Sequence, residues 1–207
     1  ANVILTMAQR HLNAIESTSA GRLFDAVSAI LGIQKKSTFE GEASMALEFA
    51  AEAWQKEHEV KNTENTKNAE NVKNTGNAPN AKNNENIDVK EQEHIFMQTN
   101  AIVWRMIEGR RQGEDVGKLA YEFHQLLAME ICAACENVRT QKKCNQVALS
   151  GGVFQNRLLL ELVEEELLKR KFQVLRHHLI PPNDGGIGLG QAVYGMAYLN
   201  KKKQTDS

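Results

Sequence analysis

The stretch Val147-Ala-Leu-Ser-Gly-Gly-Val-Phe-Gln-Asn156 decides the fold class of this chain. Its first residues are mostly apolar and predict a short buried strand, which ends at Ser150-Gly151-Gly152 and leads into an amphipathic helix over 156–170. Glycine has no Cβ, so the backbone at Gly151 and Gly152 can approach a ligand closely. The N-terminus of the following helix is expected to offer unpaired N–H groups to an anion. The stretch therefore indicates a ligand-binding turn.

A second strand and helix follow along the chain. Residues 172–176 predict a strand, residues 181–186 a rigid turn, and residues 187–199 a closing helix whose glycines permit close packing. Together with the strand over 145–149, this order favours parallel strands in a helix-rich α/β layer. A stable parallel sheet normally has more than two strands, and the chain opens with Ala1-Asn-Val rather than Met. We therefore expect a C-terminal fragment of a larger protein.

Upstream, helical periodicity predicts helices over 21–31, 43–54, 100–110 and 115–138, with Gly32 ending the first. Between them, asparagine recurs every third residue from Asn62 to Asn86, a period that fits neither a helix nor a strand. The repeat contains almost no apolar residue to bury, which is typical of a disordered insertion. The chain divides accordingly into a helical part over 1–55, a low-complexity disordered insertion over 56–94, and an α/β remainder over 95–207.

The composition narrows the cellular setting and the kinds of partner. The net charge is −1, so no broad basic surface indicates a nucleic-acid partner. No apolar run has the length of a membrane span, and no signal peptide is recognisable, so we expect no membrane partner. The three cysteines form no paired framework, which favours a reducing, cytoplasmic location.

Two glycine turns both follow predicted parallel strands: Ser150-Gly151-Gly152 and Asn183-Asp184-Gly185-Gly186. Ligands of open α/β sheets lie outside the carboxyl ends of the strands, so both turns are expected to line one crevice. Asn156 is expected to reach into that crevice with its amide. Asp184 offers a carboxylate to a metal or a ribose hydroxyl, and the alternative is that it caps the final helix.

Other candidate groups carry weaker signals. Cys132 and Cys135 lie mid-helix without a second pair of ligands, which favours buried small side chains over a zinc site. His177 and His178 are adjacent, and adjacent strand residues point to opposite faces, so both do not easily bind one ion. His124 is a lone histidine expected at a helix interface. No residue is an evident catalytic nucleophile.

Three segments in this order resemble the C-terminal part of the HypF carbamoyltransferases, the hydrogenase-maturation proteins: residues 19–32, 149–160 and 181–191. Phe39-Glu-Gly-Glu-Ala43 and Phe123-His124 fit the same family, and the match covers nearly all of the chain except the repeat. The chain is also similar, more distantly, to the TsaD family, which transfers a threonylcarbamoyl group to tRNA. The resemblance implies the last lobe of an actin/hexokinase-like (ASKHA) fold.

The resemblance also implies a reaction. HypF-like proteins use carbamoyl phosphate and ATP to make a carbamoyl-adenylate, and they pass the carbamoyl group to the C-terminal cysteine of HypE. That thiocarboxamide is then dehydrated to a thiocyanate, the source of the cyanide ligands of NiFe hydrogenases. The motif positions imply that Asp25 contacts the ribose region, that Gly41 lies against the nucleotide, that Gly151, Gly152 and Asn156 cradle the adenylate, and that Asp184 is a ligand of a divalent metal (iron, zinc or magnesium).

The chain departs from the family pattern in what precedes these motifs. Nothing matches the His-x-x-x-His pair that holds the metal in the preceding lobe, nor the acylphosphatase-like, zinc-finger and YrdC-like domains. We therefore expect this chain to need the upstream domains of a full-length protein for the reaction. One alternative is an incomplete or split-gene product that only binds a nucleotide or a partner protein. A TsaD-like tRNA-modifying transferase is disfavoured, because Phe154-Gln155 and residues 183–186 look more like HypF.

Overall fold

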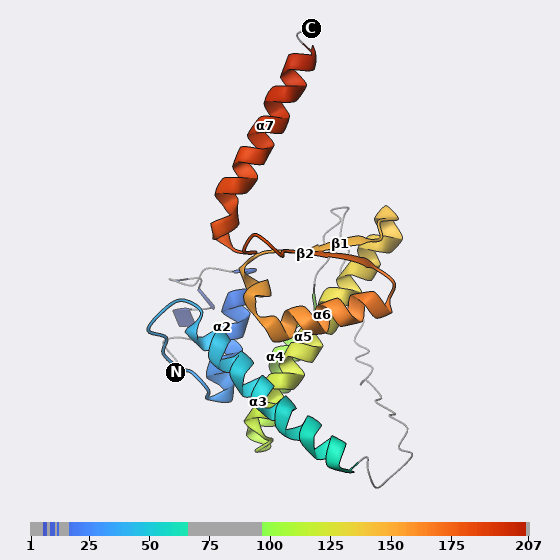
Figure 1. The fold of residues 1–207 in the computed structure, drawn as a ribbon. Coiled ribbons are helices and arrows are strands. Elements are labelled where there is room, and N and C mark those ends of the chain that lie inside the picture. Colours follow the sequence, from blue (N-terminus) through green and yellow to red (C-terminus); the bar gives the residue numbers. More distant parts are fainter. Residues whose placement is uncertain (1–5, 8, 11, 13–16, 66–96, 206–207) are drawn as a thin grey trace.

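The structure is a computed structural model that describes residues 6–7, 9–10, 12, 17–65 and 97–205 (Figure 1). The Asn-rich repeat from residue 66 onward, and with it most of the predicted insertion over 56–94, lies outside these residues.

The body is a layer of helices around one long helix. That helix is α5 (Val116–Lys142), and it packs against α3 (Glu42–Asn65), α4 (Thr99–Arg111) and α6 (Arg157–Lys169), while α2 (Ala20–Leu31) packs against α3 and α4. Side chains at helical spacing on each helix meet in one buried core, whose largest fully buried members include Phe24, Leu31, Leu47, Met106, Leu119, Phe123, Leu127 and Leu159. Gly32, at φ 79°, ends α2 as predicted.

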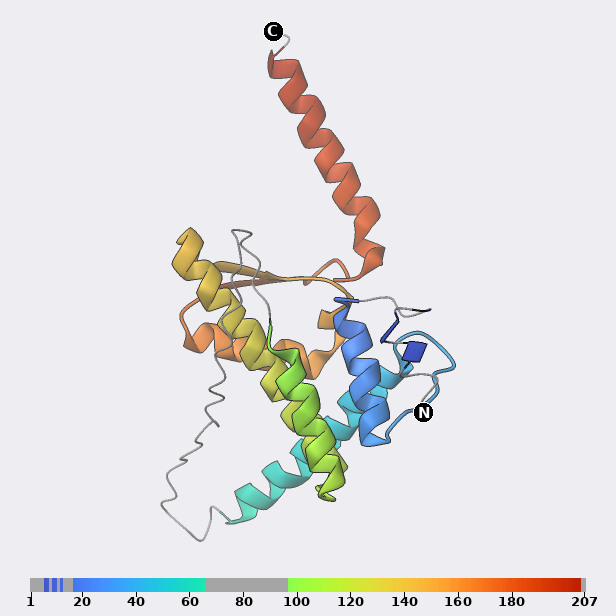
Figure 2. The same cartoon turned by 180° about the vertical axis from the view of Figure 1, so that it is seen from behind.

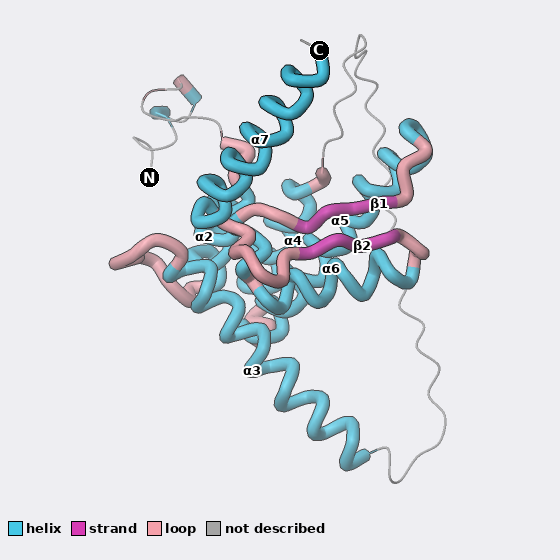
Figure 3. The backbone as a smooth tube through the Cα atoms, turned by 45° about the horizontal axis from the view of Figure 1, so that its top comes forward, coloured by secondary structure: helices cyan, strands magenta, loops and turns pink. Residues whose placement is uncertain are grey.

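A parallel strand pair lies along one side of the helices (Figure 3). β1 (Gln146–Leu149) pairs with β2 (Gln173–Arg176) in a register that runs from Gln146 opposite Gln173 to Leu149 opposite Arg176. Between them the chain passes through a short 3₁₀ helix, η1 (Gly152–Gln155), and then through α6, which packs against β2. The predicted helix-rich α/β class and the parallel pairing are confirmed, and η1 is an addition that the sequence pattern did not predict.

Helix α3 is longer than predicted. We expected it to end near Trp54, but it continues to Asn65, beyond the boundary drawn at residue 56. Apolar periodicity ends near Trp54, whereas pairs of side chains four residues apart continue to support the helix: Lys56 Nζ lies 2.9 Å from Glu52 Oε2, and Gln55 Nε2 donates to Glu59 Oε1 at 2.7 Å. Such pairs stabilise a solvent-exposed helix without any core contact.

The last helix, α7 (Ile187–Thr205), stands away from the body in two opposite views (Figures 1 and 2). Gly188, Gly190 and Gly195 were expected to permit close packing, but no described residue packs against them: a Cβ added at any of the three meets no atom within 4 Å. The apolar side chains of α7 are correspondingly exposed: Ile187, Leu189, Val193, Tyr194, Met196, Tyr198 and Leu199. Among the described residues, no helix combines the length and apolar character needed to cross a membrane.

Candidate functional site

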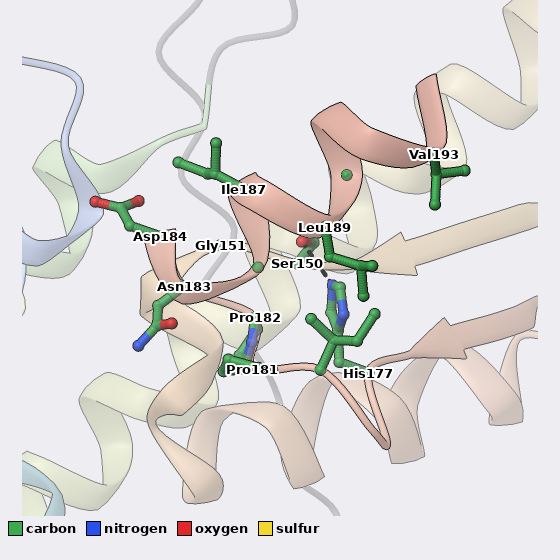
Figure 4. A pocket seen from close by; sticks show the side chains of 13 residues that line it. Ser150, Gly151, His177, Pro181, Pro182, Asn183, Asp184, Ile187, Leu189 and Val193 are labelled. Atoms are coloured by element: carbon green, nitrogen blue, oxygen red, sulfur yellow. Dashed lines mark hydrogen bonds between the residues drawn. The ribbon is translucent and has the colours of Figure 1, made fainter. Parts of the chain in front are cut away.

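The two glycine turns meet at the carboxyl ends of β1 and β2. The N–H of Gly151 donates a hydrogen bond of 2.8 Å to the carbonyl oxygen of Pro182, which ties the first turn to the second. Between them and the start of α7 lies an open cavity of ≈ 480 Å³ (Figure 4), within the range of ligand pockets. Its lining includes Ser150, Gly151, His177, Pro181, Pro182, Asn183, Asp184 and Ile187. The prediction that both turns line one crevice is confirmed.

The first turn leaves its backbone accessible. Gly151 has a φ of 98°, in the region that favours glycine, and a Cβ added there would meet no atom within 4 Å. A Cβ on Gly152 would meet only the Gln155 Oε1 atom, at 3.9 Å. Among the described residues, the Cβ positions of both glycines therefore face open space.

The second turn presents Asp184 to solvent. In the short 3₁₀ helix η2 (Asp184–Gly186) the capping side chain belongs to Asn183, whose Oδ1 accepts a hydrogen bond of 3.0 Å from the N–H of Gly185. Asn183, and not Asp184, therefore caps this turn. Asp184 is exposed at the rim of the cavity, and its carboxylate points away from Ser150 and His177 (Figure 4).

The metal prediction rests on Asp184 alone. Within the ranges that the structure describes, no group of three or more His, Cys, Asp or Glu side chains is arranged to hold a metal ion. Asp184 thus supplies a single carboxylate, and the described side chains of this region do not make up a complete metal site.

The N-terminus of α6 does not offer N–H groups to a ligand, contrary to our expectation. The Oε1 atom of Glu48, from α3, accepts from the N–H of Arg157 at 2.6 Å and from that of Leu158 at 3.2 Å. The Oδ1 atom of Asn156 accepts from the N–H of Leu159 at 2.7 Å. These acceptors belong to the chain itself, so an anion could bind at this helix end only by displacing them.

Asn156 is buried between α5 and α6 and does not line the cavity. Its Nδ2 lies 3.1 Å from His124 Nε2, while His124 Nδ1 lies 2.7 Å from the carbonyl oxygen of Ala120. Because a carbonyl oxygen can only accept, Nδ1 carries the hydrogen, and Nε2 therefore accepts from the amide of Asn156. Both polar ends of that amide are thus bonded within the chain.

Burial sets the charge state of this junction. Burial lowers the pKa of His124 to about 4, and the Ala120 carbonyl and Glu52 act in the opposite direction. His124 is therefore neutral at physiological pH, as its acceptor role requires. Burial also raises the pKa of Glu48. The hydrogen bonds from the N–H groups of Leu158 and Arg157 act in the opposite direction and lower it.

Replacing Glu48 with alanine is expected to destabilise the chain. The change leaves two N–H groups at the start of α6 without an acceptor, the half-buried one of Arg157 and the buried one of Leu158, and a buried unsatisfied donor costs about 1–3 kcal/mol. Urea denaturation should show a lower midpoint for Glu48→Ala. The control is Glu52→Ala on the same helix, which removes an ion pair with Lys56 and a charge that acts on His124 from a distance, and which should cost about 0.5 kcal/mol. Equal midpoints for the two variants would contradict the capping role of Glu48.

Three other predicted nucleotide contacts, Gly152, Asp25 and Gly41, do not line the cavity either. Asp25 lies on α2, which contacts η1, and its carboxylate is 3.2 Å from the guanidinium of Arg22. Gly41 has a φ of 84° in the turn before α3, and open space surrounds its Cβ position. The structure thus brings Gly151 and Asp184 to one cavity, and it places Asp25 on a neighbouring helix.

One pair in the cavity was missed from the sequence. His177 Nε2 lies 2.8 Å from Ser150 Oγ (Figure 4), and each residue directly follows a strand. Strand register could have revealed this pair, since Leu149 is opposite Arg176.

Elsewhere Cys132 is fully buried in the core and Cys135 is half-buried, and burial raises the pKa of both thiols, which fits the predicted role of small buried side chains.

A family model described as the second subdomain of the Kae1-like domain of carbamoyltransferases matches residues 1–191. The chain belongs to the HypF carbamoyltransferase family. It is 31% identical over 194 residues to the carbamoyltransferase HypF of Rhodobacter capsulatus and 26% identical over 193 residues to a probable carbamoyltransferase HypF of Methanocaldococcus jannaschii. Each alignment covers 93% of this chain but 21% of the relative, so the chain spans about a fifth of those proteins.

Solved HypF structures share this fold. A crystal structure of full-length HypF in the phosphate- and nucleotide-bound form has a TM-score of 0.72 at 29% identity, and it covers 96% of this chain and 23% of that one. The structure of T. kodakarensis HypF has a TM-score of 0.65 at 24% identity, covering 97% of this chain and 22% of its own. Membership of the family and the helix-rich α/β architecture predicted from the sequence are therefore both confirmed.

Proposed function

We propose that this chain forms the nucleotide-facing lobe of an ATP-dependent carbamoyltransferase. In the proposed reaction, carbamoyl phosphate and ATP give a carbamoyl-adenylate, and the carbamoyl group passes to the C-terminal cysteine of a HypE-like acceptor. The product serves the synthesis of the cyanide ligands of NiFe hydrogenases in the cytoplasm. The upstream domains of a full-length protein are the further partners, and the lobe is the last one of an ASKHA fold.

The observation that carries this proposal is the meeting of the two glycine turns at the carboxyl ends of β1 and β2, around one cavity. This is the position at which open α/β sheets bind their ligands. One family member, whose structure matches 96% of this chain, is nucleotide-bound. The cavity volume of ≈ 480 Å³ also suits a small-molecule ligand.

In the proposed site the chain binds and orients rather than attacks. The accessible backbone of Gly151 and Gly152 lies against the adenylate, with Asp25 and Gly41 nearer the ribose and base. Asn156 supports the turn from behind, because both ends of its amide are bonded within the chain. Holding the reactants in register lowers the entropic part of the barrier, and the acceptor thiolate supplies the nucleophile.

A bound divalent metal would contribute Lewis-acid charge stabilisation to this chemistry. We propose Asp184 as one of its ligands because its carboxylate is exposed at the cavity rim. The metal site has to be completed by side chains other than those described.

A second candidate is a chain that binds a nucleotide or a partner protein without transferring any group. The incomplete set of metal ligands among the described residues favours it.

The two candidate functions differ in what happens to the acceptor protein. The complete polypeptide is incubated with ATP, carbamoyl phosphate and a purified HypE-like protein, and the acceptor is measured by mass spectrometry. Added carbamoyl mass on the C-terminal cysteine supports the transferase, whereas nucleotide binding without added mass supports the second candidate.

A further inference from the structure

A buried polar junction connects the elements that carry the candidate nucleotide contacts. At its centre is His124, which is fully buried on α5 and accepts a hydrogen bond from the amide of Asn156. The ring of Phe24, next to Asp25 on α2, packs edge-on against the His124 ring at a centroid distance of 5.4 Å. Glu48, on the helix that follows Gly41, binds the adjoining end of α6.

A continuous set of hydrogen bonds joins this junction to the glycine turn. The N–H of Asn156 donates to Val153 at 3.1 Å, and the N–H of Phe154 donates to the carbonyl of Gly151, also at 3.1 Å. Gly151 in turn donates to Pro182 in the second turn. The backbone of Asn156, at the end of η1, is therefore connected through η1 to the glycine turn that lines the cavity.

We propose that His124 is a positioning residue of the nucleotide site, acting through Asn156 without touching the nucleotide. This inference rests on the proposed nucleotide-binding function. With its Nδ1 donating to Ala120, His124 holds one tautomer and presents a fixed acceptor to the amide of Asn156. That bond fixes which end of the amide faces Leu159, and it thereby fixes the cap of α6 and the turn before it.

The test compares three variants of the complete polypeptide. His124→Phe keeps a ring of similar size in the core but leaves the Asn156 amide without its acceptor. His124→Gln retains an oxygen that can accept the same hydrogen bond. Val163→Ala serves as a stability control, since it removes core packing on the buried face of α6, away from the cavity.

Two quantities are measured on each variant: the Kd for ATP, and the hydrogen exchange of peptides covering residues 147–160. For His124→Phe we expect an ATP affinity weaker by roughly tenfold or more, with faster exchange in those peptides. His124→Gln is expected to recover much of the affinity. Val163→Ala should bind ATP like the parent, even with a comparable fall in melting temperature.

Each contrary outcome has a distinct meaning. Unchanged exchange over residues 147–160 in His124→Phe would overturn the positioning role, whatever happens to ATP. Faster exchange with an unchanged Kd would also overturn it and leave His124 a structural residue only. If the unaltered polypeptide binds no ATP, the proposed function itself fails, and the positioning role fails with it. Equal losses of affinity in Val163→Ala and His124→Phe would show that general destabilisation, and not the Asn156 bond, is responsible.

Discussion

Replacing Asp184 with alanine is expected to abolish carbamoyl transfer by the complete polypeptide while leaving its fold intact. The carboxylate lies exposed at the rim of the cavity, and the local turn is capped by Asn183 instead. Substitutions at exposed positions without such contacts change the free energy of unfolding by no more than about 0.5 kcal/mol. Loss of a proposed metal ligand, by contrast, removes the charge stabilisation that the transfer requires. The measurement is carbamoyl mass on the acceptor, together with the melting temperature.

Asp115 provides the matched control for Asp184. It is the N-cap of α5, where its Oδ1 accepts from the N–H of Lys118 at 2.8 Å. Asp115→Ala should therefore cost about 1 kcal/mol of stability and leave transfer at the parent level. Asp184→Ala is thus expected to lose transfer and keep its stability, whereas Asp115→Ala is expected to lose stability and keep transfer. Transfer that persists in Asp184→Ala would remove Asp184 from the site.

Acidification is expected to destabilise the folded chain through His124. Burial lowers the pKa of His124 to about 4 in the folded chain, whereas the ordinary pKa of a histidine is 6.5. Between these values the unfolded chain binds more protons, so the stability contributed by neutral His124 is fully present above pH 6.5 and is lost as the pH falls toward 4. The shift corresponds to about 3 kcal/mol.

The measurement is the free energy of unfolding of the 207-residue chain by urea, at a series of pH values from 7 to 4. Glu48 acts in the opposite direction, because its raised pKa favours the folded state at low pH, so the parent curve alone does not isolate His124. The contribution of His124 is instead the difference between the unfolding free energies of the unaltered chain and of His124→Phe at each pH. We expect the parent to lose about 3 kcal/mol more than the variant over this range. Parallel curves would show that His124 is not held neutral in the fold.

The sequence predicted those features that depend on local pattern. Periodicity located α2, α4, α5 and α6 to within a few residues, because each has a stripe of apolar side chains that enters the core. Strand order predicted that the turns at Gly151 and Asp184 would meet, since the carboxyl ends of parallel strands share one edge.

The features that were missed depend on contacts between distant residues. Glu48 is 109 residues away from Arg157, so no local pattern could show that it occupies the N-terminus of α6. The same holds for the hydrogen bond between Asn156 and His124, which lies 32 residues earlier. Asn156 was expected to contact the ligand, but its amide is bonded within the chain. The exposure of α7 also could not be predicted, because an apolar helix with small residues usually indicates a buried one.

The central question is whether a nucleotide contacts both glycine turns at once. Hydrogen exchange of the complete polypeptide is measured with and without a non-hydrolysable ATP analogue, and peptides covering residues 147–156 and 181–187 are compared with peptides of α4. We predict slower exchange in both turns when the analogue is bound and no change in α4. Binding of the analogue without protection of either turn would contradict the assignment of this cavity as part of the nucleotide site.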